Sequence, residues 1–422
     1  MKKRPSDERG STEASRLNVR PDSTLDTSKI QTPAFVIEEG LLRHNLSVLK
    51  YIKDKTGCKM YQALKTWATW ELFPIVREYL DGTEVSSLHE TRLGYDEFNT
   101  QVHLFAPAYK DEEFEEILKY CSTIIFNSFD QWKKFKPQVF AYQEKTGKHI
   151  ECGLRINPEN IGEEGHSGLW SPTAPGSRLG IRISEFRSAL AEDPRMLEGI
   201  DGLHFHVFWD KTLPDLKRAV AVVEEKFGEY IPQMKWINLG GGQKITDDGY
   251  DVEGLIMLVN DFQKKHNVTV HMEPGASIVK YAGTLVTRVL DIVYRDDVSY
   301  KIAILDMSFN AHTPDFLLSP DLDMPVRGAT IVRDEKEFKN HPNLYQLGGG
   351  TCVTGDHLSH FHVFEQPLKP GDAVIMEDGI QYNMVQCTMF NGVQHPSIVL
   401  WKDGKPQIIR EFTYEDYRRR MG

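Results

Sequence analysis

The sequence contains Cys58-Lys-Met-Tyr-Gln-Ala-Leu-Lys65, a short apolar, strand-like run that ends on a single amine. An aromatic helix start, Thr66-Trp67-Ala68-Thr69-Trp70, follows directly. A desolvated ammonium loses its proton more easily, so a lysine in this position is a candidate for the neutral amine that condenses with an aldehyde. A lysine that extends from a strand end into water would give the same pattern. The rest of the chain has to decide between these interpretations.

Strand and helix patterns alternate on both sides of this run. An apolar strand over Thr32–Ile37 and a helical pattern from Glu39 to Lys53 precede it, and helical stretches such as Leu72–Leu80 and Ala219–Phe227 follow it. The candidate strands end near Leu64, Ser87, Ala106, Phe126, Asn157, His206, Gly240 and Glu273. Eight such alternations predict an α/β fold with a closed (β/α)8, TIM-like barrel.

The chain has 422 residues, too many for one core of usual size, and we expect two domains. Beyond Tyr281 the helical alternation stops and short runs rich in Val, Thr and Ile predict a mostly β domain. We assign residues 31–283 to the barrel and 284–422 to the C-terminal β domain, with 31–38 as an alternative source of its first strand. Residues 1–30 are polar, lack the apolar core of a signal peptide and are predicted to be a disordered tail.

The composition is that of a soluble globular enzyme, with 26% charged and 40% hydrophobic residues. The net charge of -11 disfavours a nucleic-acid or anionic-membrane surface and is compatible with a cationic substrate. Five cysteines without paired short spacings give neither a disulfide framework nor a zinc signature, and they suit a reducing cytosol. No stretch is apolar enough to span a membrane. We therefore expect a cytoplasmic protein with no metal, nucleic-acid or membrane partner.

Barrel chemistry gathers at the carboxyl ends of the strands, and the polar residues selected independently fall there. These residues are Lys65, Arg155, His206, Gly240, Gly241, Gly242 and Glu273. Three consecutive glycines leave backbone amides accessible to a phosphate, although a tight loop would produce the same triplet. The spacing of a dinucleotide fingerprint is missing, so a single phosphate fits better than a pyrophosphate.

His204 and His206 place two imidazoles on one face of a strand. Either ring could be an ordinary hydrogen-bonded histidine, and we select His206 because it is nearer the carboxyl end of the strand. Glu273 ends the eighth strand before Pro274-Gly275, where a capping or salt-bridging role is the alternative to a functional one.

Further motifs extend over most of the chain. They are, in order, Ala63-Leu64-Lys65, Ser86-Ser87-Leu88-His89-Glu90, Leu154-Arg155-Ile156-Asn157-Pro158, Pro175-Gly176-Ser177-Arg178-Leu179-Gly180, Gly202-Leu203-His204-Phe205-His206, Leu239-Gly240-Gly241-Gly242, Glu273-Pro274-Gly275, Thr351-Cys352-Val353-Thr354-Gly355-Asp356 and Phe390-Asn391-Gly392. With these motifs the chain, from about Thr32 to Trp401, resembles the fold type III pyridoxal-phosphate decarboxylases. Within this group of ornithine and diaminopimelate decarboxylases, it most closely resembles carboxynorspermidine decarboxylase.

The resemblance implies roles for the barrel residues. Lys65 would bind pyridoxal 5'-phosphate covalently, His206 would stack on its ring, Gly240–Gly242 would bind its phosphate and Glu273 would pair with its ring nitrogen. A carboxylate at that nitrogen favours the protonated ring, which can accept the electron pair left when carbon dioxide departs. An alanine racemase of the same fold type has an arginine there, so Glu273 favours decarboxylation over racemisation.

The resemblance also implies roles for the β domain. Cys352 would deliver a proton from the partner subunit, Asp356 would receive the distal amine of the substrate, and Tyr382 would bind the cofactor phosphate. His312 and Asp315 match the segment that recognises the polar tail of the substrate. A packed core cysteine and a strand tyrosine are the alternatives for Cys352 and Tyr382. Sites that need residues from two chains imply a homodimer with shared active sites.

Two positions depart from the carboxynorspermidine pattern. Val207-Phe208-Trp209-Asp210 replaces a typical Leu-Cys-Glu, and Ala276 replaces a glutamate, so acidic groups have been exchanged for apolar or neutral ones. These exchanges favour a less cationic or bulkier substrate, and Trp209 is either a stacking platform or simple packing. Asp306 matches the pattern, which suggests that some recognition of a polar tail is retained.

We therefore expect a decarboxylase that acts on an amine with a 3-amino-3-carboxypropyl group, such as carboxynorspermidine or carboxyspermidine in polyamine biosynthesis. One alternative is a tailoring decarboxylase that acts on the same group in a peptide or nucleotide natural product. Another is a pyridoxal-phosphate-binding protein without turnover, which the presence of Cys352 and Asp356 disfavours.

Overall fold

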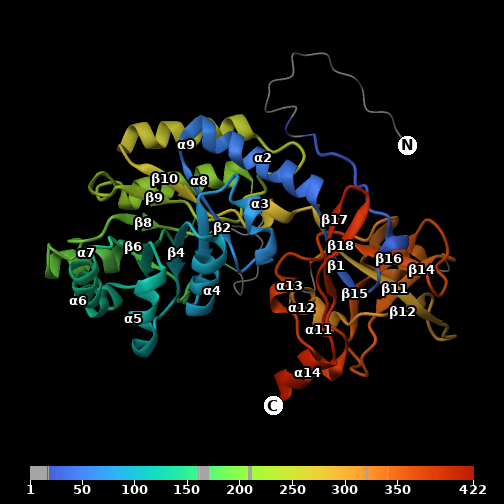
Figure 1. Ribbon diagram of the computed structural model, residues 1–422. Coiled ribbons are helices and arrows are strands. Elements are labelled where there is room, and N and C mark those ends of the chain that lie inside the picture. The colour runs from blue at the N-terminus through green and yellow to red at the C-terminus, as the bar shows by residue number, and fades with distance from the viewer. Residues whose placement is uncertain are drawn as a thin grey trace. The chain divides into compact units, whose positions relative to one another are not determined.

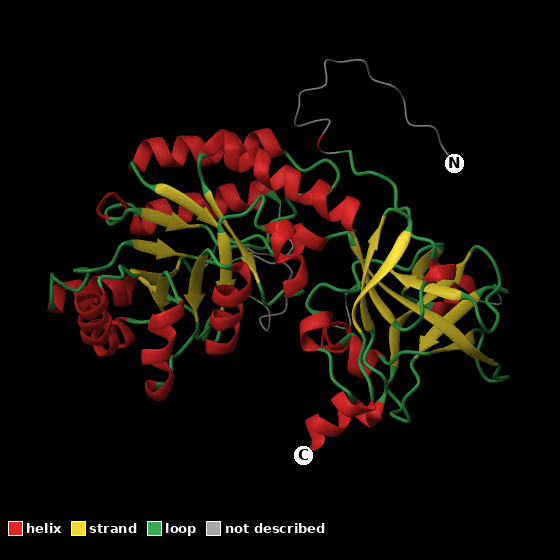
Figure 2. Ribbon diagram, viewed as in Figure 1, coloured by secondary structure: helices red, strands yellow, loops and turns green. Residues whose placement is uncertain are grey.

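The computed structural model describes residues 17, 19–159, 161, 171–207, 212–318, 322–339 and 341–422 (Figure 1). The chain divides into two compact units. The first contains His44–Ile278, and the second is formed by Pro21–Arg43 together with Val279–Gly422. Helices surround the strands of the first unit, whereas strands dominate the second (Figure 2).

The first unit is a closed barrel of eight parallel strands. These are β2 (Lys59–Ala63), β3 (Gly82–Val85), β4 (Gln101–Phe105), β5 (Thr123–Phe126), β6 (Glu151–Asn157), β8 (Gly202–His204), β9 (Trp236–Asn238) and β10 (Thr269–Met272). Each strand pairs with the next in this order, and β10 pairs with β2 to close the ring. A short strand, β7 (Ile181–Arg182), adds to β6. The predicted barrel is confirmed, with its strands ending at or just before the predicted positions.

Helices precede, connect and follow the barrel strands. They are α2 (Glu39–Thr56), α3 (Phe73–Val76), α4 (Leu88–Leu93), α5 (Asp111–Tyr120), α6 (Phe129–Thr146), α7 (Ile183–Glu192), α8 (Leu213–Phe227), α9 (Val252–His266) and α10 (Ala276–Val279). In α5 the buried side chains, Phe114, Ile117 and Leu118, recur at the helical spacing that faces a core. The helix predicted over Leu72–Leu80 is shorter than expected, because hydrogen-bonded turns rather than α-helix continue the chain beyond α3.

The interior of the barrel is filled by a layer of rings. Tyr61 stacks on His103 with ring centroids 3.6 Å apart, and Trp236 stacks on His271 at 5.1 Å. A Cβ atom at Gly202 would lie 2.1 Å from the Trp236 ring, so only glycine admits the tryptophan there. Burial lowers the pKa of His271 to about 4 and that of His103 well below its usual value, which keeps both imidazoles neutral.

The second unit is built on a nine-stranded sheet with the strand order β13-β15-β14-β12-β11-β1-β17-β18 and with β16 on β11. Its strands are β1 (Ala34–Glu38), β11 (Gly283–Val293), β12 (Lys301–Leu305), β13 (Ala329–Val332), β14 (Leu344–Gly348), β15 (His357–Phe364), β16 (Ala373–Met376), β17 (Ser397–Lys402) and β18 (Lys405–Arg410). Its helices are α11 (Phe309–His312), α12 (Pro314–Leu318), α13 (Asn383–Gln386) and α14 (Tyr414–Met421). β1 runs antiparallel to β11 and parallel to β17, so residues 34–38 belong to this sheet.

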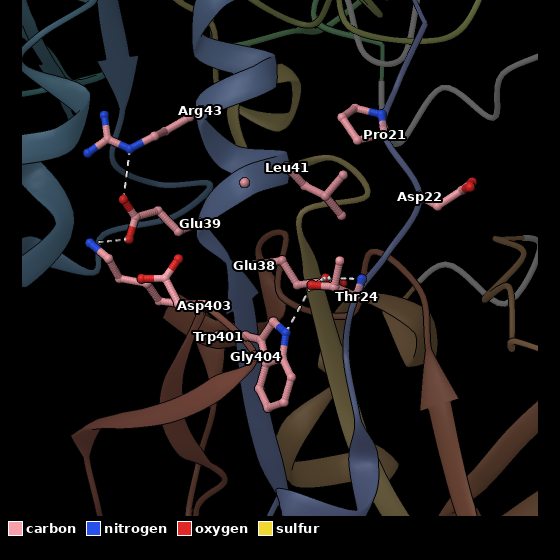
Figure 3. A pocket seen from close by; sticks show the side chains of 12 residues that line it. Pro21, Asp22, Thr24, Glu38, Glu39, Leu41, Arg43, Trp401, Asp403 and Gly404 are labelled. Atoms are coloured by element: carbon pink, nitrogen blue, oxygen red, sulfur yellow. Dashed lines mark hydrogen bonds and ion pairs between the residues drawn. The ribbon is translucent and has the colours of Figure 1, made fainter.

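Part of the predicted tail packs against the second unit. Ser23 Oγ donates to Glu38 Oε1 over 2.6 Å, Trp401 Nε1 donates to Thr24 Oγ1 over 3.1 Å, and Ile30 is buried. The prediction of disorder is therefore wrong for this part, because these polar residues are partners of the buried Glu38. Residues 1–16 and 18 lie outside the described residues. Thr24, Glu38 and Trp401 also line a pocket of about 640 Å³ that includes none of the predicted site residues (Figure 3).

None of the helices in the described part of the chain combines the length and apolar character that a membrane crossing requires.

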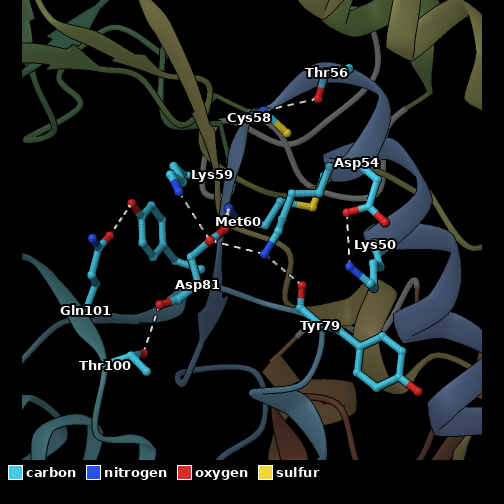
Figure 4. Close-up of polar contacts among 12 residues, drawn as sticks. Lys50, Asp54, Thr56, Cys58, Lys59, Met60, Tyr79, Asp81, Thr100 and Gln101 are labelled. Carbon is cyan, nitrogen blue, oxygen red and sulfur yellow. Dashed lines mark hydrogen bonds and ion pairs between the residues drawn. The ribbon is translucent and has the colours of Figure 1, made fainter.

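Asp81 joins the amino-terminal ends of two barrel strands (Figure 4). Its carboxylate accepts a hydrogen bond from Met60 N over 2.9 Å and lies 3.1 Å from Lys53 Nζ and 3.6 Å from Lys59 Nζ. Its main-chain oxygen accepts from Thr100 Oγ1 over 2.8 Å. Only 15% of its side chain is exposed, so these contacts are partly shielded from water.

Replacing Asp81 with alanine is expected to lower the free energy of unfolding by about 2–3 kcal/mol, because a partly buried N–H and two ammonium groups lose their acceptor. Urea unfolding followed by tryptophan fluorescence measures this loss. Asp54→Ala is the matched control, since Asp54 forms an exposed 3.0 Å pair with Lys50 that contributes about 0.5 kcal/mol or less. Equal, small losses in both variants would contradict the role given to Asp81.

Candidate active site

Lys65 follows β2 at the carboxyl end of the barrel. Its Nζ atom lies 3.1 Å from Oε2 of Glu84, a buried residue of the neighbouring strand β3. Leu64 N donates to the main-chain oxygen of Glu84 over 3.0 Å, which fixes the two strand ends together. Burial raises the pKa of Glu84 to about 7, although the charge of Lys65 lowers it. The pair therefore combines an amine with a carboxylate that can take up or release a proton near neutral pH.

Glu273 follows β10 and is buried on the same barrel edge. Asn238 Nδ2 donates to Glu273 Oε1 over 2.7 Å, and His204 Nε2 lies 3.4 Å from the same oxygen. Burial alone would raise the pKa of Glu273, but His204 and Lys65 outweigh burial and hold this pKa well below its usual value. Glu273 is therefore an ionised carboxylate inside the barrel, as a partner of a protonated ring nitrogen has to be.

His206 is held from two sides. Gly241 N donates to His206 Nδ1 over 3.1 Å, and Arg155 Nη2 donates to the main-chain oxygen of His206 over 2.9 Å. The Arg155 guanidinium also lies over the Phe105 ring, 4.4 Å from its centroid. Burial and the charges of Lys65 and Arg155 lower the pKa of His206 well below its usual value. The ring is therefore a neutral imidazole that accepts at Nδ1, suitable for stacking on a flat cofactor.

The glycine run forms a turn that only glycine can make. Gly240 and Gly242 have φ values of +69° and +83°. A Cβ atom at Gly240 would lie 2.8 Å from His206, and one at Gly241 would lie 2.1 Å from the main-chain oxygen of Glu273. Gly240 N donates to Asn238 Oδ1 over 2.8 Å. The turn therefore lies between the His206 side chain and the main chain at Glu273, and without side chains of its own it lets a group approach its backbone closely.

Together these residues fit pyridoxal 5'-phosphate. A lysine amine can bind its aldehyde, an ionised buried carboxylate suits its ring nitrogen, a neutral imidazole can stack on its ring, and a glycine turn admits a phosphate.

In the second unit, Cys352 lies on the exposed loop between β14 and β15. Its Sγ atom accepts a hydrogen bond from Asn391 Nδ2 over 3.2 Å. The other four cysteines, Cys58, Cys121, Cys152 and Cys387, are buried or half-buried. A solvent-accessible thiol on a loop is the form that proton transfer to a bound molecule requires.

Asp356 closes the base of the Cys352 loop. Its Oδ2 atom accepts from the N and Oγ1 atoms of Thr351 over 3.0 and 2.6 Å, and its Oδ1 atom accepts from Ser308 Oγ over 3.2 Å and Asn310 N over 3.0 Å. The side chain is buried, and a Cβ atom at Gly349 would lie 2.4 Å from it. Asp356 therefore fixes the conformation of the loop that carries Cys352.

The remaining predicted residues of this unit differ in exposure. His312 is buried and accepts at Nδ1 from Ser308 N over 3.2 Å, and burial lowers its pKa to about 3. Asp315 is half-buried and accepts from Gln386 Nε2 over 3.3 Å, and burial raises its pKa. Tyr382 is half-buried at the start of α13, with a φ of +57°.

The first unit thus brings Lys65, His206, Gly240–Gly242 and Glu273 to one barrel edge. Two partners at this edge, Glu84 and Asn238, were not selected from the sequence. A signal existed for Glu84, since it is the one charged residue in the otherwise apolar or neutral run of β3, but nothing in the sequence distinguishes Asn238. Asn391 belongs to the motif Phe390-Asn391-Gly392, but the sequence predicts no role for its side chain. Phe208 and Trp209 lie outside the described residues.

Comparisons with known proteins agree with this chemistry. The family described as pyridoxal-dependent decarboxylase, C-terminal sheet domain, matches residues 79–379. A carboxynorspermidine/carboxyspermidine decarboxylase of Campylobacter jejuni is 38% identical over 92% of this chain and 98% of its own length. A carboxyaminopropylagmatine decarboxylase of Synechocystis is 36% identical over 94% of this chain and 96% of its own length.

Among solved structures, carboxynorspermidine decarboxylase of Campylobacter jejuni, complexed with norspermidine, has a TM-score of 0.80 and 38% sequence identity. The alignment covers 93% of this chain and all of that one. With this similarity over nearly the whole length and the barrel-edge residues in place, the chain belongs to the pyridoxal-dependent decarboxylases, carboxy-lyases whose cofactor is pyridoxal 5'-phosphate.

Proposed function

We propose that this decarboxylase removes the α-carboxylate from an amine that bears a 3-amino-3-carboxypropyl group, with carboxynorspermidine and carboxyspermidine as first candidates in polyamine biosynthesis. The observation that carries the chemistry is the meeting of Lys65, Glu84 and Glu273 at one barrel edge. The names of the relatives support the substrate class, and that of the Synechocystis relative adds carboxyaminopropylagmatine as a third candidate.

Each barrel residue has a distinct part in the proposed reaction. When bound, pyridoxal phosphate supplies an electron sink for the pair left by carbon dioxide. Lys65 would hold the cofactor through its aldehyde carbon, and Glu84 would take up and return the Lys65 proton. Glu273, kept ionised, would favour a proton on the ring nitrogen. The Gly240–Gly242 turn would receive the phosphate, and His206 would support the ring.

The second unit contributes the groups that finish the reaction and select the substrate. We propose that Cys352 delivers the proton that replaces the carboxylate and that Tyr382 binds the phosphate. Asp356, Asp315 and His312 are proposed to form the environment of the substrate's distal amine. Asp356 already accepts hydrogen bonds at both oxygens, so an amine that reaches it would share or displace one of these donors.

We further propose a cytoplasmic homodimer in which Cys352 and Asp356 serve the site of the partner. The five cysteines are all free, which is consistent with a reducing compartment. Cell fractionation tests the compartment directly, since recovery with secreted proteins would contradict it.

Carbon dioxide release from carboxynorspermidine, carboxyspermidine and carboxyaminopropylagmatine is the first test of substrate. Turnover of at least one is expected, and Lys65→Ala is expected to abolish turnover together with the visible absorbance of the bound cofactor. Lys59→Ala is the matched control, because Lys59 lies at the opposite end of the same strand and should leave both readouts intact. Cofactor binding without turnover of any of the three would contradict the polyamine proposal and favour a natural-product tailoring substrate.

The role of Glu84 predicts how cofactor loading depends on pH. Above pH 7 Glu84 is mostly ionised and can accept the Lys65 proton, whereas below pH 7 it is mostly protonated and cannot. The rate at which apoprotein gains cofactor absorbance should therefore rise through about pH 7. Glu84→Gln should slow loading by about ten-fold or more at pH 8 and remove the inflection. Glu71→Gln, at an exposed carboxylate in the connection between β2 and β3, should load like the native protein. An unchanged inflection in Glu84→Gln would exclude Glu84 as its source.

Shared sites predict complementation between two impaired variants. When Lys65→Ala and Cys352→Ala are unfolded, mixed and refolded together, half of the dimers combine the two chains, and each such dimer keeps one intact site. Activity should recover to about one quarter of the native value. If each chain completes its own site, the activity of the mixture will not exceed the mean activity of the two variants refolded separately.

A further inference from the structure

We propose that Asn391 is a positioning residue that orients the Cys352 thiol. This inference rests on the proposed role of Cys352 as proton donor. The direct contact is the hydrogen bond from Asn391 Nδ2 to Cys352 Sγ over 3.2 Å, which joins two loops far apart in the sequence.

Both loops are attached to the same helix, α11. On one side, Ser308 Oγ and Asn310 N donate to Asp356 at the base of the Cys352 loop. On the other side, Thr388 N donates to the main-chain oxygen of Ala311 over 2.8 Å, three residues before Asn391. Cys387 Sγ donates to the main-chain oxygen of His312 over 3.4 Å.

The helix itself is firmly placed, because Phe309, Ala311 and His312 are all buried. A shared, buried attachment fixes the relative position of the two loops. The fold therefore holds Asn391 and Cys352 in contact, although both side chains are exposed.

The backbone at Asn391 restricts which residue can make this contact. Asn391 has φ +56° and ψ +11°, in the left-handed region that Gly, Asn and Asp adopt most readily. Gly392 continues in the same region with φ +70°, and a Cβ atom there would lie 3.4 Å from Tyr417 of α14. Asparagine alone among these three residue types combines the required backbone with a side-chain donor.

The amide donor serves the proton transfer in two ways. It occupies a lone pair of the sulfur, which leaves the S–H bond free to point toward the reacting carbon. In the transfer, the S–H bond breaks and a C–H bond forms with the electron pair that the carbon retains after loss of carbon dioxide. The sulfur keeps the S–H pair as a thiolate, which the Asn391 N–H stabilises until solvent returns a proton.

Alkylation of Cys352 by iodoacetamide in the holoenzyme, followed by mass spectrometry, reads the environment of the sulfur without reference to turnover. Asn391→Gly keeps the left-handed backbone and removes the donor, and Asn391→Asp keeps the shape and places an anion beside the sulfur. At pH 7.5 we expect alkylation about three-fold slower in Asn391→Gly and about ten-fold slower in Asn391→Asp. We also expect kcat to fall about ten-fold in both variants with little change in KM.

Asn267→Gly is the matched control, since Asn267 is also left-handed, at φ +55°, but ends α9 in the barrel. It should change neither readout. Alkylation and kcat that stay native in both Asn391 variants would overturn the proposal. The proposed role of Cys352 has a separate test, the turnover of Cys352→Ala. Full turnover of that variant would exclude Cys352 as the proton donor. Slower alkylation of Cys352 in the Asn391 variants would still show that Asn391 orients the thiol.

Discussion

The pairing of β10 with β2 is the constraint on which the rest of the site depends. Met272 lies opposite Met60 in this register, so the chain that follows each strand emerges at the same barrel edge. Lys65 and Glu273 meet only because this pairing closes the ring. Glu84 joins them from β3, the neighbour of β2 on its other side. An open sheet of the same strands would place β2 and β10 at opposite edges and would have no site.

Closure also sets the electrostatics of this edge. Glu84 and Glu273 are both buried carboxylates near Lys65, yet the pKa of Glu84 is raised and that of Glu273 is lowered. The difference arises because Glu273 also has His204 as a partner, which lowers its pKa. Two carboxylates with separated pKa values can serve two purposes, a permanent charge and a proton carrier. The neutral rings below them, including His103 and His271, keep other charges out of the barrel interior.

The sequence was most informative where local pattern and tertiary role coincide. Parallel barrel strands are apolar runs that end in polar residues, so the positions of Lys65, His206 and Glu273 could be predicted from the strand ends. It was least informative where a residue depends on a distant partner. Ser23 and Thr24 have a tail-like composition, and only the fold supplies their partner, the buried Glu38. The role of Asn238 could not be predicted for the same reason, because its partner Glu273 follows another strand.

Asp356 is predicted to receive the distal amine of the substrate, and Asp315 belongs to the segment predicted to recognise its polar tail. The two carboxylates differ in their capacity to pair with an ammonium group. Asp356 accepts at both oxygens from groups that hold the Cys352 loop, and displacing one buried donor costs about 1–3 kcal/mol. Among the described residues, Asp315 accepts a hydrogen bond from Gln386 Nε2 alone, and burial raises its pKa. A bound ammonium would relieve that unfavourable charge burial, so the gain from pairing is larger at Asp315. Under the proposed function, Asp356 anchors the loop in addition to lying in the environment of the distal amine, and Asp315 gains more from pairing directly with that amine.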